Sequence, residues 1–239
     1  MAGRRLSAGK LRPSRLRLGL EALAILAVTG LLGLALPEVL RRLDFFRIRR
    51  VEITGLQYLA PNKVIAALGL DSTASVFDDL IAAEARASAL PGIESAQVKR
   101  RLPGTLEISL VEAVPVALAP RPGGMALLDS RGKVLPYDPA ASAPDLPVVA
   151  AADTGVASVL ASVQEYDPAL FGRIRTAWRA REDVVLDVDG HRLLFGRFVT
   201  AEDIRAVMAV AQDLARAGRR YQELDGRFAG QVIVRQAGA

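Results

Sequence analysis

The sequence contains no cysteine and only one histidine, His191, among its 239 residues. Without cysteine there can be no disulfide framework, no cysteine nucleophile and no zinc site of the Cys/His type. One histidine excludes a metal centre built on paired histidines, and it allows a Ser-His-Asp triad only with His191 as the base. Aromatic residues are also few, at 5%, but an apolar content of 51% argues against disorder. We therefore predict a folded chain of one large or two small domains.

Positive charge is concentrated at the N-terminal end of the sequence. The net charge of +5 divides into +8 for residues 1–50 and −3 for the remaining 189 residues. A nucleic-acid-binding domain needs its basic excess on a folded surface, whereas the part of this chain that should fold is slightly acidic. The sequence therefore predicts no nucleic-acid partner.

An uncharged apolar run lies between two basic clusters. Residues 22–36 carry no charge, and with Leu18-Gly19-Leu20 the run reaches about the length that crosses a bilayer. We predict one transmembrane helix over 18–37, in contact with membrane lipid and preceded by a basic cytoplasmic tail, 1–17. Six basic and no acidic residues precede it, against five basic and two acidic in 37–50, so the positive-inside bias favours a cytoplasmic N-terminus. The predicted location is the inner (plasma) membrane, single-pass and type II, with most of the chain outside the cytoplasm.

Two other interpretations of the apolar run remain open. A cleaved signal peptide has similar basic and apolar parts, although Ala35-Leu36-Pro37 lacks a small-x-small cleavage site. A buried helix of a soluble protein would show a polar stripe, and this run is apolar all round.

The chain from about residue 44 alternates short strands and short helices. Apolar and polar residues alternate between Phe46 and Ile53, with a phase slip at Arg49-Arg50 that predicts a bulge. Pro103-Gly104 has the sequence of a tight type II turn. Four further elements are expected: a helix over 61–68, a helix over 76–90, a strand over 95–101 and a strand over 105–112. The predicted unit is β-α-α-β-β.

The same residues resemble a POTRA domain. The resemblance lies in FRIRRVEITG, which starts at Phe46, and in LPGIESAQVKRRLPGTLEISLVEAVPVA, which runs from Leu90 to Ala117. It implies a POTRA domain over 44–117. POTRA domains also occur in outer-membrane assembly and secretion proteins, so this resemblance identifies the module and not its function.

A second, strand-rich module is expected over 118–236. Met125 to Leu135 predicts a hairpin that turns at Asp129–Gly132, and Asp189-Gly190 predicts another. Further elements are expected as helices over 155–165 and 201–217 and an extended segment over 221–235. The predicted fold class is α+β: a transmembrane helix, the POTRA domain, and a module with an antiparallel sheet and flanking helices.

The order of these parts is similar to the FtsQ/DivIB family of bacterial cell-division proteins over residues 15–236. The resemblance is carried by the single apolar helix, the POTRA-like region, LDSRGKVLP from Leu128 and LDGRFAGQVIVR from Leu224. One departure is Gly226, which replaces an apolar residue and should weaken the start of the last strand. The resemblance implies a non-catalytic divisome scaffold, located at the division septum, that links division proteins to septal peptidoglycan synthesis.

The last strand is the predicted partner-binding site. Gln231 to Arg235 is β-branched, and an edge strand can accept a partner strand through its free N–H and C=O groups. The resemblance implies that this region recruits FtsB with FtsL, and that the POTRA domain and the transmembrane helix contact other division proteins. The predicted partner-binding residues are Phe228, Gln231, Val232, Ile233, Val234 and Arg235. The alternative is that this segment is an ordinary paired strand, whose edges are protected by neighbouring strands.

The sequence offers little for catalysis. It has no Gly-rich phosphate loop, and the acidic pairs Asp78-Asp79, Glu182-Asp183 and Glu202-Asp203 fit helix caps better than glycoside hydrolysis. We predict no enzyme activity, catalytic residue, cofactor, metal or small-molecule substrate. Two rival functions remain open: a membrane-anchored cell-wall hydrolase, and a POTRA-containing secretion or outer-membrane assembly factor.

Overall fold

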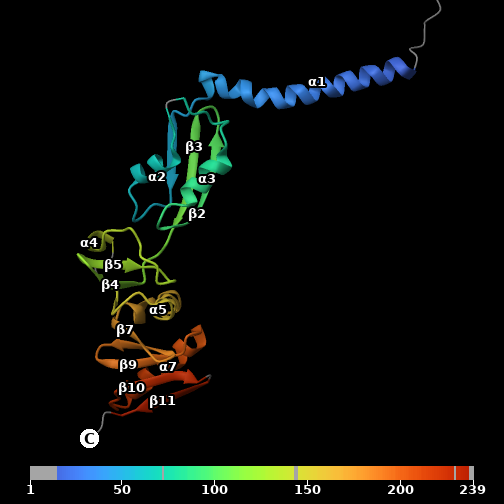
Figure 1. Ribbon diagram of the computed structural model, residues 1–239. Helices are drawn as coiled ribbons and strands as arrows, with labels where there is room; N and C mark the ends of the chain where they lie inside the picture. Colours follow the sequence, from blue (N-terminus) through green and yellow to red (C-terminus); the bar gives the residue numbers. More distant parts are fainter. Residues whose placement is uncertain (1–14, 72, 143–144, 229, 237–239) are drawn as a thin grey trace, which may run out of the picture. The chain divides into compact units, whose positions relative to one another are not determined.

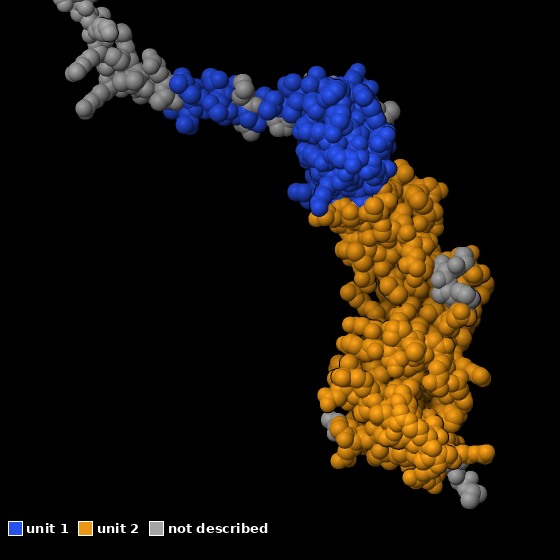
Figure 2. Space-filling model, turned by 180° about the vertical axis from the view of Figure 1, so that it is seen from behind, with its two compact units in different colours: residues 1–52, 70–82, 98–108 blue, residues 53–69, 83–97, 109–239 orange. Residues whose placement is uncertain are grey.

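The computed structural model describes residues 15–71, 73–142, 145–228 and 230–236 (Figure 1). Most of the predicted basic tail, 1–17, therefore lies outside the described residues. Contacts divide the chain into two compact units, which Figure 2 shows in different colours. Unit 1 comprises 1–52, 70–82 and 98–108, and unit 2 comprises 53–69, 83–97 and 109–239.

The first element is a long helix, α1 (Arg15–Arg42). It contains the whole of the run 18–37 that the sequence predicts to be helical, and it leaves large apolar side chains between Leu23 and Val39 exposed. A search of the described residues finds no helix long and apolar enough to span a membrane. The helix itself is confirmed, whereas its passage through a membrane stays a prediction.

The chain then forms the predicted β-α-α-β-β order. After a short 3-10 helix, η1 (Asp44–Phe46), the elements are β1 (Arg50–Thr54), α2 (Pro61–Leu68), α3 (Leu80–Ser88), β2 (Ile93–Arg101) and β3 (Thr105–Glu112). The three strands make a sheet in the order β1-β3-β2, so β3 is central.

Local details of this region confirm one expectation and correct two. The carbonyl oxygen of Gly104 accepts hydrogen bonds from Arg49 N (2.8 Å) and Arg50 N (3.2 Å), so two residues oppose one at the predicted phase slip. Helix α3 begins later than residue 76 because Asp79 caps it, accepting from Ile81 N and Ala82 N. The expected type II turn is wrong, since Gly104 does not adopt the positive φ that this turn requires.

The larger sheet has eight strands in the order β11-β10-β9-β8-β7-β6-β4-β5. The strands are β4 (Ala117–Arg121), β5 (Gly124–Leu128), β6 (Val148–Val149), β7 (Ile174–Ala180), β8 (Asp183–Val188), β9 (His191–Phe195), β10 (Glu223–Phe228) and β11 (Gln231–Arg235). The helices are α4 (Pro139–Ser142), α5 (Thr154–Tyr166), α6 (Pro168–Phe171) and α7 (Ala201–Arg216).

The prediction of an antiparallel sheet is wrong in part, because the sheet is mixed. The pairs β4–β6, β6–β7 and β9–β10 are parallel. Parallel strands that follow one another in the chain need a crossover connection. Here α5 and α6 connect β6 to β7, and α7 connects β9 to β10. The sequence indicates α5 and α7 but not α6, nor which strands these helices connect.

The two expected hairpins have different outcomes. Asp189 and Gly190 both have positive φ, and they join antiparallel β8 and β9 as predicted. The expected hairpin over 125–135, in contrast, forms only in part. Strand β5 pairs with β4, and the residues after the turn at 129–132 pair with β5 only through a single bridge between Leu128 and Val134.

The main core lies between the large sheet and helices α5 and α7. Helix α7 begins at a capping box in which Asp203 Oδ2 accepts from Thr200 N (2.9 Å) and Asp203 N donates to Thr200 Oγ1 (3.2 Å). Its apolar side chains recur at helical spacing and are buried against the strands. The largest buried side chains of this core include Leu160, Leu170, Leu186, Phe195, Ile204 and Leu224.

Candidate functional site

The predicted partner-binding strand lies at an edge of the large sheet. Strand β11 pairs with β10 on one side, and no other described segment pairs with its second side. Five of the six predicted site residues form this strand. The sixth, Phe228, is the last residue of β10 and pairs with Gln231. The structure thus brings the six residues together on one hairpin.

The backbone of β11 directs alternate residues toward the free side. Arg235 O accepts a hydrogen bond from Gln222 N (2.9 Å), so the peptide groups of Arg235 face β10. The N–H and C=O directions alternate along a strand, which turns those of Val232 and Val234 toward the open edge. These two residues are therefore the ones that can pair with an added strand.

The side chains of β11 alternate at right angles to this edge. Val232 and Val234 pack against the main core. On the other face Ile233 is 44% exposed, and Phe228 beside it in the hairpin is 48% exposed. An added strand would meet free backbone at the edge and apolar side chains next to it.

A hollow of about 520 Å³ lies beside this hairpin, at the first turn of α7. Its lining includes Phe198, Asp203, Arg227, Phe228, Gln231 and Val232. Phe198 is 86% exposed, and the guanidinium groups of Arg197 and Arg227 each lie 5.6 Å from the ring centre of the following phenylalanine. Phe198 and Arg227 are missing from the predicted site.

Arg227 is held by two carboxylates. Its Nε and Nη2 donate to the two oxygens of Asp225 (2.7 and 2.6 Å), and its Nη1 donates to Asp183 Oδ2 (2.5 Å). Asp225 is fully buried, and the hydrogen bonds from Arg227 lower the pKa of its carboxyl. The same bonds raise the pKa of Arg227. The alternation of Asp225 and Arg227 in the sequence is the signal that could have identified this pair.

The sequence departure at Gly226 coincides with an irregularity in strand β10. The strand starts at Glu223, before this glycine, but its pairing with β11 shifts register between Asp225 and Phe228. Gly226 itself is buried. A Cβ at this position would come within 2.4 Å of Val207 Cγ2 in α7. The absent side chain therefore lets the helix pack closely against the strand.

The opposite edge of the sheet, at β5, is covered by the chain itself. Leu135 N donates to Leu127 O (2.8 Å), and Asp129 N donates to Lys133 O (2.9 Å). Asp129 Oδ1 also accepts from Arg131 N and Lys133 N, which fixes the turn that brings this segment back.

Glu112 and Tyr137 lie beside the covered edge. The buried Glu112 carboxylate accepts from three successive backbone N–H groups, those of Gln57, Tyr58 and Leu59, at 2.6–2.8 Å. The Tyr137 hydroxyl donates toward Gly92 O (2.6 Å) and Ala113 O (3.1 Å), and its ring stacks on Tyr58. Burial, with a further contribution from the charge of Glu112, raises the pKa of Tyr137 to about 12.

At least one acid of each pair that could serve hydrolysis is engaged in a structural contact. Asp78 accepts from Ser75 N, Asp79 caps α3, and Asp203 belongs to the capping box of α7. Asp183 binds Arg227, as described above. Among the described residues, no group of three or more histidine, aspartate or glutamate side chains is placed to hold a metal ion.

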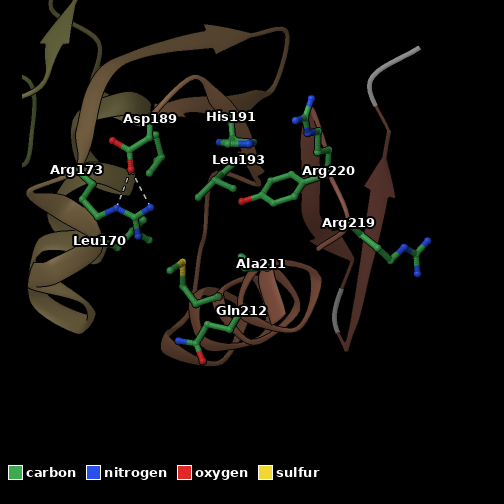
Figure 3. Close-up of a pocket in the computed structure, with 13 residues that line it drawn as sticks. Leu170, Arg173, Asp189, His191, Leu193, Ala211, Gln212, Arg219 and Arg220 are labelled. Carbon is green, nitrogen blue, oxygen red and sulfur yellow. Dashed lines mark hydrogen bonds and ion pairs between the residues drawn. The ribbon is translucent and has the colours of Figure 1, made fainter. Parts of the chain in front are cut away.

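His191 lies in a separate pocket of about 350 Å³ (Figure 3). Its ring packs against Tyr221, with ring centres 4.5 Å apart, so the side chain is half-buried. Arg173 points to Asp189 in the β8–β9 turn, and burial raises the pKa of Tyr221. No serine is found among the described residues that line this pocket, so the possible Ser-His-Asp triad is not formed here.

Comparison with known proteins gives matches along most of the chain. Residues 46–113 match the family model of the FtsQ-type POTRA domain, and residues 117–229 match that of the C-terminal part of cell division protein FtsQ/DivIB. A cell division protein FtsQ of Rhodothermus marinus is 28% identical over 92% of this chain and 86% of its own length.

Two further similarities are more limited. A cell division protein FtsQ of Mycolicibacterium smegmatis is 33% identical over 55% of this chain, and the chain spans only 41% of its length. The solved extracytoplasmic domain of the cell division protein DivIB of Geobacillus stearothermophilus is 18% identical, with a TM-score of 0.32, over 44% of this chain and 96% of that domain.

Proposed function

Because the chain belongs to the FtsQ/DivIB family of cell division proteins, we propose that it is a non-catalytic scaffold of the division machinery. In this role it recruits division proteins at the septum and links them to septal peptidoglycan synthesis. The observation that carries the proposal is the outer edge of β11, with which no segment of the described chain pairs, because a scaffold needs surfaces that bind other chains.

The partner at this edge is FtsB together with FtsL. A strand of the partner adds to β11 by β-augmentation and pairs with the outward N–H and C=O groups of Val232 and Val234. Ile233 and Phe228 supply exposed apolar contacts beside the new strand.

The roles of the acidic side chains support a function without catalysis. A carboxylate that caps a helix or holds an arginine is unavailable as a general acid or base. The paired acids of this chain are used in that way at α3, at α7 and at Arg227.

The FtsQ/DivIB proteins are membrane proteins of the division septum, and residues 18–37 of this chain form the single membrane crossing. The uncharged run, its place within α1 and the exposed apolar side chains of that helix support this topology. The N-terminus is cytoplasmic. The POTRA domain, residues 44–117, and the membrane helix contact other division proteins, while the module over 118–236 carries the FtsB/FtsL site.

Substitutions on β11 test the partner site. Val232→Pro removes an outward N–H group, and Ile233→Asp places a charge beside the edge, so each should abolish capture of FtsB and FtsL by the full chain. Both variants should still localise to the septum. Val232→Ala is the matched control, because it shortens the side chain and keeps the N–H group. Unchanged capture of FtsB and FtsL by Val232→Pro would contradict the proposal.

A further inference from the structure

The last turn of α1 is attached to the folded part of unit 1. Arg41 Nε donates a hydrogen bond to Phe77 O (2.9 Å) and lies 3.9 Å from a carboxylate oxygen of Asp78. The backbone of residues 46–48 pairs with the segment 74–76 through Ile48 N to Ala74 O (2.9 Å) and Val76 N to Phe46 O (3.0 Å). The C-terminal end of α1 is therefore in direct contact with the part of unit 1 that carries the sheet.

Three phenylalanines gather at this attachment. The ring of Phe46 packs edge to face on Phe45 and on Phe77, with ring centres 5.1 and 5.0 Å apart. Phe46 is half-buried by these contacts, but Phe45 remains 60% exposed. An exposed aromatic ring next to an apolar helix is typical of the zone where a protein leaves a bilayer.

A second segment adds apolar surface at the same end of unit 1. The hydrogen bonds from Arg49 N and Arg50 N to Gly104 O hold the β2–β3 turn against the start of β1. This turn carries Leu102, which is 57% exposed, and Leu43 just after α1 is 45% exposed. We name Leu43, Phe45 and Leu102 together the apical patch.

The two segments that carry the apical patch are rich in basic residues. Residues 41–50 contain five arginines and one aspartate, and residues 99–101 are all basic. Some of them are paired, Arg47 with Asp44 (2.9 Å) and Arg101 with Glu52 (2.6 Å) and Glu107 (3.2 Å), and Arg100 lies over the ring of Phe77. A surface with exposed apolar side chains and a cationic surround matches the anionic phosphates and upper acyl chains of phospholipids.

We propose that the apical patch lies in the headgroup region of the bilayer and holds unit 1 against the membrane surface. The inference rests on the proposed membrane crossing of α1. Helix α1 continues from residue 37 to Arg42, which is about 7.5 Å at 1.5 Å per residue, and the headgroup layer on each side of the hydrocarbon core is about 5–8 Å thick. Leu43 and Phe45 follow directly, so the patch comes at the level of the headgroup layer.

Tryptophan fluorescence in nanodiscs tests this placement, because the chain has one tryptophan, Trp178. Phe45→Trp and Leu102→Trp are each made in full-length Trp178→Phe protein and placed in nanodiscs of phosphatidylcholine and phosphatidylglycerol. Lipids brominated near the headgroup end of the acyl chain serve as the quencher. Phe198→Trp, at an exposed site in unit 2, is the matched control. Circular dichroism checks that each variant is folded. If Trp178→Phe unfolds, the substitutions are made in the wild-type chain, and the fluorescence of Trp178 is subtracted.

The introduced tryptophans at positions 45 and 102 should lose more than half of their emission in brominated lipid, whereas the one at position 198 should lose almost none. Acrylamide should quench the first two less than the third. Val28→Trp separates this inference from the membrane crossing. Quenching at position 28 without quenching at position 45 overturns only the apical patch, and no quenching at either position overturns both. Protection from acrylamide without lipid quenching means that a protein covers the patch, which also overturns the inference.

Discussion

The β5 and β11 edges of the eight-stranded sheet differ in what lies beside them. At β5 the following segment returns and donates from Leu135 N to Leu127 O, and a buried cluster that includes Tyr137 packs nearby. At β11 the peptide groups of Val232 and Val234 face outward, and no described segment pairs with them. An exposed strand edge risks unwanted pairing, and folded proteins usually cover or shorten it. One edge of this sheet is therefore covered by the chain itself, and the other is left open for the partner strand that we propose.

The largest difference in stability is expected between changes at Glu112, which is buried, and at Glu223, which is partly buried. Glu112→Ala leaves the N–H groups of Gln57, Tyr58 and Leu59 without their acceptor, so we expect a loss of about 3 kcal/mol or more in the free energy of unfolding. Glu223→Ala near β11 removes only an ion pair with the exposed Arg235, worth about 1 kcal/mol or less. Urea unfolding of both variants measures this. An equal loss in the free energy of unfolding in the two variants would contradict the expected difference between the β5 and β11 ends of the sheet.

Gly226→Ala tests packing at the β11 end. The added methyl group meets Val207 Cγ2 at 2.4 Å, and overpacking of this kind costs about 1–3 kcal/mol. Adding Val207→Ala should recover part of the loss, because the second change removes the clashing atom. A double-mutant cycle measures the coupling. Losses that simply add would show that the two positions do not interact.

Tyr137→Phe tests the β5 end in alkaline solution. At neutral pH the lost hydrogen bonds to Gly92 O and Ala113 O should cost about 1 kcal/mol. In the folded wild type the pKa of Tyr137 is raised to about 12, whereas an unfolded tyrosine ionises near pH 10. Its contribution is therefore complete below about pH 10 and is lost as the pH rises toward 12.

The Tyr137→Phe variant should accordingly lose less stability than the wild type between about pH 10 and pH 12. Denaturant titrations across this range measure the difference. Tyr166→Phe, at an exposed side chain, is the control and should follow the wild type. A variant as sensitive to alkali as the wild type would disprove the role given to Tyr137.

The smallest change in stability is expected for Val232→Pro. The lost N–H group points away from β10, and proline is tolerated at such edge positions, so the cost should stay below about 0.5 kcal/mol. Leu135→Pro at the other edge removes a donor that is used and should cost clearly more. Thermal unfolding of the two variants compares them. A large loss in Val232→Pro would mean that this N–H group is not free.

The sequence predicted most elements of the fold and the location of the candidate site. Alternating apolar residues, turn residues and caps are local signals, and they identified the β-α-α-β-β order, the Asp189-Gly190 hairpin and helix α7. The parallel pairs of the large sheet were missed, because pairing through a crossover depends on distant residues. The packing reason for Gly226 was also missed, since only the position of Val207 explains why a side chain does not fit there.

The candidate site was predictable to a similar extent. The β-branched strand Gln231–Arg235 and its place at a sheet edge were both predicted from the sequence, whereas the binding of a partner there stays a prediction. Phe198 comes to the site from the loop before α7, and Arg227 is fixed there by Asp225 and Asp183. Local sequence patterns do not fully reveal either arrangement.

Amide hydrogen exchange along β11, measured on the full chain with and without FtsB and FtsL, tests the central claim most directly. In the free protein the amides of Val232 and Val234 should exchange rapidly and that of Leu135 slowly. Binding should slow exchange at Val232 and Val234 and leave Leu135 unchanged. Unaltered rapid exchange at both valines in a saturated complex would show that the partner does not pair with this edge.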